Sequence, residues 1–336
     1  MTNSPMDPRP NARKDRIDSL AATAGATGTA VKDVRIDTAG SVKDTGGVSL
    51  IASAWARLRR NPVFLFGATI TLLFVVLALI SPWIAPNDPA QRIQALLEQQ
   101  SPSNPVPGSA PGYPLGADDF GRDLLSRLIV GARQTLIVGV FATLFGLAGG
   151  LVLGTLAGAL GGWVDSLVMR VVDVMLSIPS LLLAVSIAAL APRPSQWTVI
   201  IAIATVQVPV FARLLRGSML AQRSSDHVLA ARALGVKQSA IVFRHMLPNS
   251  LGPVIVQSTL VLATSIIDAA ALSFLGLGNP DDRQPEWGQM LGQAQKWLAD
   301  YPHLAFYPAA CIIVVALGFT LMGESLREAL DPKSRR

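Results

Sequence analysis

Residues 63–80 read VFLFGATITLLFVVLALI, a run of 18 residues without one charged side chain. A helix rises about 1.5 Å per residue and the hydrocarbon core of a bilayer is about 30 Å thick, so about 20 apolar residues cross it. Because lipid offers the backbone no hydrogen-bond partner, such a run is expected to be helical. The stretch therefore predicts a membrane-spanning helix.

Five further apolar segments follow the first. They cover residues 135–160, 167–190, 197–215, 254–277 and 304–322. Each is long enough to cross a bilayer as a helix, so we predict an all-α membrane protein with six transmembrane helices. The fourth segment is the weakest of them, because Arg213 and Arg216 shorten its apolar core.

The composition agrees with a membrane protein and argues against several other classes. Charged residues make up 15% of the chain, against about a quarter in a typical soluble domain. One cysteine and three scattered histidines do not suit a disulfide framework or a metal centre. No phosphate-binding loop, nucleophile elbow or HExxH pair occurs, and no basic patch alternates with aromatic residues. We therefore expect no catalytic residue, cofactor, metal ion or nucleic-acid partner for this chain.

Positive charges gather at residues 57–60, 213–244 and 327–336. With six spans these three places fall on one side of the membrane, and the positive-inside rule makes that side the cytoplasm. Both termini are then predicted to be cytoplasmic. The predicted organisation is a largely disordered tail at 1–61, a first transmembrane helix at 62–85, an external loop at 86–133, a transmembrane core at 134–325 that contains a cytoplasmic loop at 223–249, and a tail at 326–336.

Three glycines of the second span, Gly150, Gly154 and Gly158, recur every four residues and so share one helix face. Small residues on a face let helices approach closely in lipid. Packing within the chain is the favoured reading, and contact with a moving helix or another subunit is the alternative. Acidic residues within the spans are few: Asp173 stands three residues after Arg170 and can pair with it, and Asp268 lies in the fifth span. Two such acids near opposite ends of their spans do not form a proton relay, and we expect solvation at a helix end or pairing at an interface for both.

The loop from 226 to 248 reads DHVLAARALGVKQSAIVFRHMLP. Asp226 is suited to cap a short helix, and Gly235 is suited to the left-handed position that ends it. A second helix is predicted over 238–246, where Pro248 discourages continuation. A helix of about 13 Å is marginal on its own in water, so it requires a partner surface. The alternative is a charged loop that only satisfies the positive-inside rule.

This loop resembles the signature of the inner-membrane permeases of binding-protein-dependent ABC importers, which reads Glu-Ala-Ala, three residues, Gly, and a spacer that ends in Leu-Pro. Leu229 occupies the position of the signature Glu, a departure that concerns one polar contact to the ATPase and not the helix itself. The residues that carry the predicted ATPase-coupling loop are Asp226, Ala230, Ala231, Arg232, Gly235, Arg244, Leu247 and Pro248.

Further motifs resemble the dipeptide, oligopeptide and nickel permeases of the "C" type, over roughly residues 113–333. They are LGADDFGRD at 115–123, LSFLGLG at 272–278, PEWGQML at 285–291 and GESLREALDP at 323–332. The external signature is carried by Gly116, Asp118, Gly121, Arg122 and Asp123. Arg122 is able to pair with Asp118 or Asp119, and the alternative is that it faces the substrate.

The resemblance implies a type I ABC importer permease fold in the cell's inner membrane. It also implies a transport subunit and not an enzyme, forming half of a pathway for dipeptides or oligopeptides. The implied partners are a homologous second permease, two ATP-binding subunits that hold ATP and magnesium, an external solute-binding protein and membrane lipid. Nickel or another small solute is the alternative cargo, and a stand-alone secondary transporter is the weaker alternative.

Overall fold

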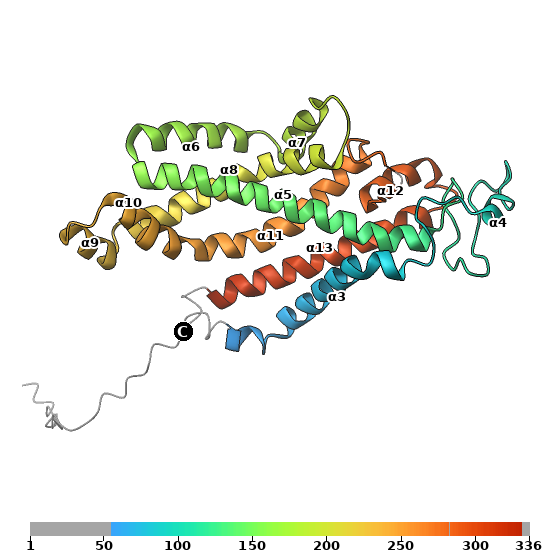
Figure 1. Ribbon diagram of the computed structural model, residues 1–336, viewed down its shortest axis with the longest axis horizontal. Helices are drawn as coiled ribbons and strands as arrows, with labels where there is room; N and C mark the ends of the chain where they lie inside the picture. The colour runs from blue at the N-terminus through green and yellow to red at the C-terminus, as the bar shows by residue number, and fades with distance from the viewer. Residues whose placement is uncertain (1–54, 282, 331–336) are drawn as a thin grey trace, which may run out of the picture. The chain divides into compact units, whose positions relative to one another are not determined.

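The computed structural model describes residues 55–281 and 283–330, and their regular structure is helical. The helices long and apolar enough to cross a membrane unbroken are α3 (Pro62–Ile84), α5 (Leu124–Leu160), α8 (Gln196–Arg223), α11 (Leu247–Phe274) and α13 (His303–Leu330). They lie alongside one another (Figure 1). The all-α prediction is therefore confirmed. Most of the predicted tail at 1–61, and the last part of the tail at 326–336, lie outside the described residues.

The third predicted span is not one straight helix. The chain forms α6 (Gly162–Ser177) and α7 (Ser180–Ala189), which meet at an angle of 95°. Pro179 stands at the break and Ile178 before it is extended, because proline lacks an N–H and disfavours helical geometry in the preceding residue. The prediction of a single helix over 167–190 is wrong in this respect, and six spans are reached only if the bent pair counts as one.

The second helix of the loop also differs from its prediction, because it does not end at Met246. The short α10 (Gln238–Ala240) runs into a π-helical turn, η1 (Ile241–Met246), which continues directly into α11. The Leu247 N–H donates to the Val242 carbonyl five residues earlier. A proline ring crowds the carbonyl four residues before it, and the wider π turn makes room for Pro248.

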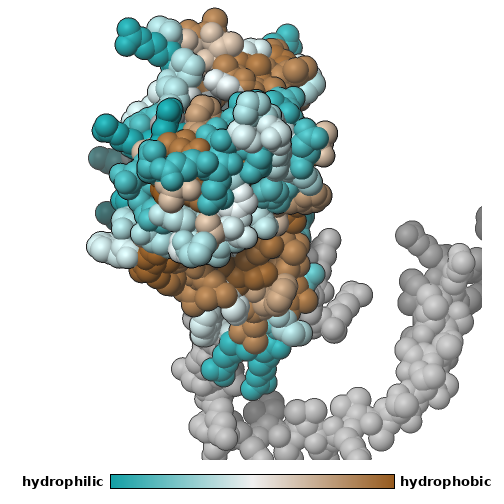
Figure 2. Space-filling view, turned by 90° about the vertical axis from the view of Figure 1, so that its right-hand side faces the viewer, coloured by the Kyte–Doolittle hydropathy of each residue, from teal (hydrophilic) through white to brown (hydrophobic). Residues whose placement is uncertain are grey.

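Close packing of α5 and α8 forms the centre of the bundle, and α3 packs beside α13. The segments at 85–123 and 275–302 contain α4 (Gln94–Leu97), α12 (Trp287–Ala294) and the 3-10 turn η2 (Gln295–Trp297). The end of the bundle that carries α4 has a largely hydrophilic surface with hydrophobic surface on its flanks (Figure 2). The helix α9 (Asp226–Ala233) lies at the opposite end (Figure 1).

Candidate functional site

The helix α9 is held against the bundle by one apolar face. Val228 is completely buried and Ala231 is 8% exposed. Both belong to a buried cluster with residues of α8 and η1, among them Met219 and Met246. Ser225, not Asp226, occupies the N-cap position, and Asp226 is the first helical residue. The predicted capping role of Asp226 is therefore wrong, although a carboxylate in the first turn still interacts favourably with the helix dipole.

The far end of α9 turns back sharply at Gly235. This residue has φ of +75°, so the predicted left-handed conformation is confirmed. The Val236 N–H donates to the Ala231 carbonyl (3.1 Å) and the Gly235 N–H donates to the Arg232 carbonyl (2.9 Å). This pair of bonds is the Schellman motif, which satisfies carbonyls at the end of a helix. The turn fixes the direction in which α10 leaves α9.

A polar cluster ties α9 to the start of α11. The side-chain amide of Asn249 donates to the His245 carbonyl (2.7 Å) and lies 3.3 Å from His227 Nε2. The rings of His227 and His245 are 6.5 Å apart between centroids. Sequence reasoning missed this cluster, since its members are up to 22 residues apart and follow no motif. Together with the buried face, this cluster attaches α9 firmly to α8 and α11.

The other face of α9, with the segment that follows it, is exposed and carries large apolar side chains beside charged ones. Leu229 is 49% exposed, Leu234 83% and Phe243 of η1 62%. Of the residues predicted for the coupling loop, Ala231 is buried, Leu247 is half-buried, and Asp226, Ala230, Arg232, Gly235, Arg244 and Pro248 are exposed. Leu229, which replaces the expected Glu, thus adds apolar surface to this face. A firmly attached helix that exposes large apolar side chains is suited to contact with another protein.

The glycines of α5 lie against α8. A Cβ atom at Gly154 would come within 2.8 Å of the Ala212 carbonyl oxygen, and one at Gly158 within 2.9 Å of the Met219 Cβ. At Gly150 it would collide with Phe211. The glycine face therefore brings α5 and α8 together within the chain, which is the favoured of the two readings of the sequence.

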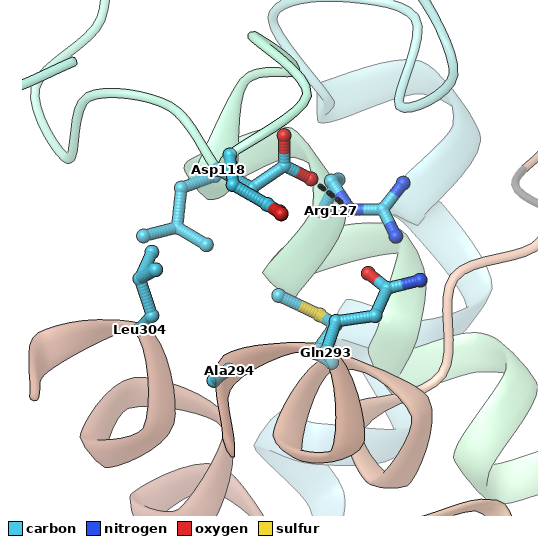
Figure 3. A pocket seen from close by; sticks show the side chains of 8 residues that line it. Asp118, Arg127, Gln293, Ala294 and Leu304 are labelled. Carbon is cyan, nitrogen blue, oxygen red and sulfur yellow. Dashed lines mark ion pairs between the residues drawn. The ribbon is translucent and has the colours of Figure 1, made fainter. Parts of the chain in front are cut away.

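The external signature builds a buried ionic cluster at the end that carries α4. Asp118 Oδ2 lies 2.7 Å from Arg122 Nε and 3.4 Å from Arg127 Nε. Figure 3 shows Asp118 turned toward Arg127, with Gln293 of α12 beside them. Arg122 also donates to the Gln293 side chain (3.1 Å). Arg122 therefore pairs with Asp118, whereas Asp119 pairs with Lys296 (2.5 Å); the role of Arg127 was not predicted.

Asp123 begins α5. Its carboxylate accepts the backbone N–H groups of Leu125 (3.2 Å) and Ser126 (3.3 Å), as an N-cap residue does. Gly116 and Gly121 have φ of +71° and +73° and shape the turns on either side of the cluster. The signature residues thus hold one another and the start of a transmembrane helix.

Two ion pairs join α6 to α8. Asp165 accepts two bonds from Arg216, of 2.5 Å and 2.7 Å. Asp173 pairs with Arg213 of α8 and not with Arg170, its possible partner within α6. The partners are 40 residues apart in the chain, and no local pattern announces them. Arg213 and Arg216, which interrupt the apolar fourth span, thus form ion pairs with acidic residues of the third span.

A buried glutamate lies on the α4 side of the membrane-spanning helices. Glu286 precedes α12, is 4% exposed, and accepts a bond of 2.9 Å from the Ser273 hydroxyl. Burial raises the pKa of Glu286 from its ordinary 4.5 to about 7, although the serine bond opposes this rise. Sequence reasoning placed this residue inside a motif without assigning it a role.

Comparison with known proteins gives consistent matches. The model of a family described as binding-protein-dependent transport system inner membrane component matches residues 150–336, and that of the N-terminal transmembrane domain of oligopeptide transport permease C matches residues 49–104. A dipeptide transport system permease protein, DppC, of Alkalihalophilus pseudofirmus is 41% identical over 86% of this chain and 91% of its own length.

Two further similarities extend this result. A glutathione transport system permease protein, GsiD, of Escherichia coli O6:K15:H31 is 40% identical over 83% of this chain and 89% of its own. The MetNI methionine ABC transporter, solved in inward-facing conformations, contains a chain that superposes with a TM-score of 0.52 at 20% identity, covering 62% of this chain and 98% of that one. At that identity the superposition speaks for the fold alone.

Proposed function

Since the chain belongs to the family of inner-membrane components of binding-protein-dependent transport systems, we propose that it carries small peptides. It is a multi-pass protein of the inner membrane and a permease subunit of an ABC importer. Its relatives include proteins named for dipeptide, di/tripeptide and glutathione transport. These share a peptide or peptide-like cargo, which favours peptides of two or three residues over nickel.

The observation that carries the mechanism is that α9 has one exposed face, while its opposite face is packed against the bundle. Leu229, Leu234 and Phe243 present apolar surface to a partner, while the buried cluster and Asn249 attach the helix to α8 and α11. A partner that grips α9 therefore moves the membrane helices with it. We assign this face to an ATP-binding subunit, which binds ATP and magnesium in place of this chain. A second permease, a second ATPase and a solute-binding protein complete the proposed complex, with both termini of this chain in the cytoplasm.

Replacement of Gly235 tests this coupling. No atom outside its immediate neighbours lies within 4 Å of a Cβ built there, but its φ of +75° is strained for a bulky side chain. Gly235→Trp therefore adds an indole to the exposed face of α9 and also strains the turn that ends α9. Gly235→Asn is the matched control, because asparagine tolerates the left-handed conformation. In proteoliposomes with the complete importer, the Trp variant should abolish dialanine uptake and its stimulation of ATP hydrolysis. The Asn variant should retain both, and normal uptake by the Trp variant would contradict the assignment.

Substrate class is tested in the same proteoliposomes. Uptake of labelled dialanine is measured in competition with peptides of two to six residues, with glutathione and with a nickel salt. Competition by dipeptides and tripeptides supports the proposal. Competition by nickel alone would overturn the cargo while leaving the coupling role of α9 intact.

A further inference from the structure

A hollow of about 610 Å³ opens between α6, α8 and α11. This volume lies within the range of small-molecule sites, which is about 300–1,000 Å³. A Cβ at Gly217 meets no atom within 4 Å, so the hollow reaches the backbone of α8. Its lining residues are Leu176 of α6, Val210, Arg213, Leu214, Gly217 and Ser218 of α8, and Pro253 and Gln257 of α11.

The charged group of this hollow is Arg213, with its partner Asp173 beside it. Their side chains are 55% and 63% exposed. Arg213 lies ten residues before the end of α8 at Arg223, and Asp173 lies eleven residues after the start of α6 at Gly162. At about 1.5 Å per residue both are roughly 15 Å from those helix ends, so each lies on a helix and not in a connecting loop. Charged residues on membrane-spanning helices are rare and almost always face the interior of a bundle or a water-filled cavity, and Arg213 lines such a hollow.

The second ion pair between the same helices provides a contrast. The side chains of Arg216 and Asp165 are 32% and 18% exposed, and they form two bonds. That pair is partly covered and serves to hold α6 to α8. The chemistry of the two pairs is the same, but only the Arg213–Asp173 pair presents most of its surface outward. Attachment of the helices alone does not account for its exposure.

We propose that this hollow is a wall of the translocation pathway, and that Arg213 and Asp173 receive the charged ends of a passing peptide. The inference rests on the proposed peptide transport. A peptide carries one carboxylate and one ammonium group. The guanidinium of Arg213 can bind the carboxylate through two parallel bonds, and Asp173 can accept the ammonium. Arg213 then exchanges the carboxylate of Asp173 for that of the peptide, and Asp173 exchanges the guanidinium for the ammonium, so that no charge is left unpaired.

Neutralising Asp173 or Arg213 should change the ratio of Ala-Lys to Ala-Glu uptake in opposite directions. Asp173→Asn leaves a net positive charge in the pathway, so uptake of Ala-Lys should fall relative to Ala-Glu. Arg213→Gln leaves a net negative charge and should shift the ratio the other way. A unit charge about 6 Å away, at an effective dielectric constant of about 40, changes an equilibrium roughly tenfold. We expect each uptake ratio to change by about that factor.

Asp165→Asn and Arg216→Gln are the matched controls, since they alter the same helices with the same chemistry. They should change uptake of Ala-Lys, Ala-Ala and Ala-Glu by one common factor. Equal ratios in the Asp173 and Arg213 variants would overturn the inference while wild-type peptide uptake still upheld the proposed function. Failure of the wild-type complex to import any peptide would instead refute the proposed function.

A labelling experiment tests the pathway independently of uptake. Cys311 is the chain's single cysteine, so Cys311→Ala provides a background for Gly217→Cys. In the complete importer a membrane-impermeant, charged thiol reagent should label this cysteine, and excess dialanine should slow the labelling at least several-fold. Leu72→Cys on α3, at a position that is 63% exposed and apolar, should stay unlabelled. Absent labelling at 217, as contact with lipid or a second subunit would produce, or labelling that peptide does not slow, would overturn the inference.

Discussion

Replacement of Glu286 by glutamine should remove a pH dependence from the stability of the end of the bundle that carries α12. The glutamate is 4% exposed and accepts a hydrogen bond from the Ser273 hydroxyl. Burial disfavours the ionised carboxylate and raises the pKa to about 7 from 4.5. Glutamine has nearly the same shape and does not titrate, so it isolates the effect of the charge.

The sign and size follow from the two pKa values. Below pH 4.5 the folded and unfolded chains both hold the proton, and its contribution to stability is fully present. Between pH 4.5 and 7 the unfolded chain releases the proton first, so stability falls as the pH rises through the folded-state pKa. Each tenfold change in acid dissociation is equivalent to about 1.4 kcal/mol. The wild-type chain should therefore lose about 3 kcal/mol between pH 4 and pH 8, and Glu286→Gln should not.

Hydrogen exchange of the α12 amides, followed by mass spectrometry on the purified protein from pH 4.5 to 8 and corrected for intrinsic exchange, measures this loss as increased local opening. Ser273→Ala removes the bond that favours the ionised form and should raise the pKa of Glu286 further. Glu98→Gln, at an exposed glutamate beside α4, is the control and should follow the wild type. Parallel pH profiles for the wild type and the Glu286 variant would refute the reasoning.

Three further substitutions test the packing and the ionic cluster. Gly150→Ala should destabilise the protein by about 1–3 kcal/mol, because its methyl group collides with Phe211. Gly217→Ala meets open space and should stabilise the protein by about 0.5–1 kcal/mol. Equal melting temperatures of the two variants in detergent would contradict this. Asp118→Asn should cost about 3–5 kcal/mol, because it removes the carboxylate that two buried arginines contact. Limited proteolysis should then cleave the 85–123 segment faster, and unchanged cleavage would argue against the cluster.

The features that the sequence alone predicted correctly depend on short stretches of chain. The apolar length of 63–80 is enough to identify α3, and the left-handed turn at Gly235 needs only the end of one helix. The glycine face of α5 was predictable because a four-residue repeat places its members together whatever their partner is. The partner itself, α8, could not be read from that repeat.

The wrong predictions about helix ends concern proline, which is compatible with two different local structures. Pro179 breaks the third span, whereas Pro248 is accommodated by a π turn and lies within a continuous helix. Both prolines lack an N–H, and the geometry of the preceding turn decides between a break and a bulge. The partner of Asp173 was left open for a related reason. Arg170, three residues earlier, is within reach on the same helix, but the structure pairs Asp173 with Arg213 of another helix.

These contacts together indicate where the permease is rigid and where it can move. Close approach of α5 and α8 through glycine leaves no room for sliding, and α9 is attached to α8 by buried apolar contacts. By contrast, α6 is joined to α8 by ion pairs at Arg213 and Arg216, one of them mostly exposed. Exposed ion pairs are weak and exchange partners readily. A displacement of α9 should therefore carry α5 and α8 as one body, and relative motion should occur between that body and α6, beside the hollow that contains Arg213.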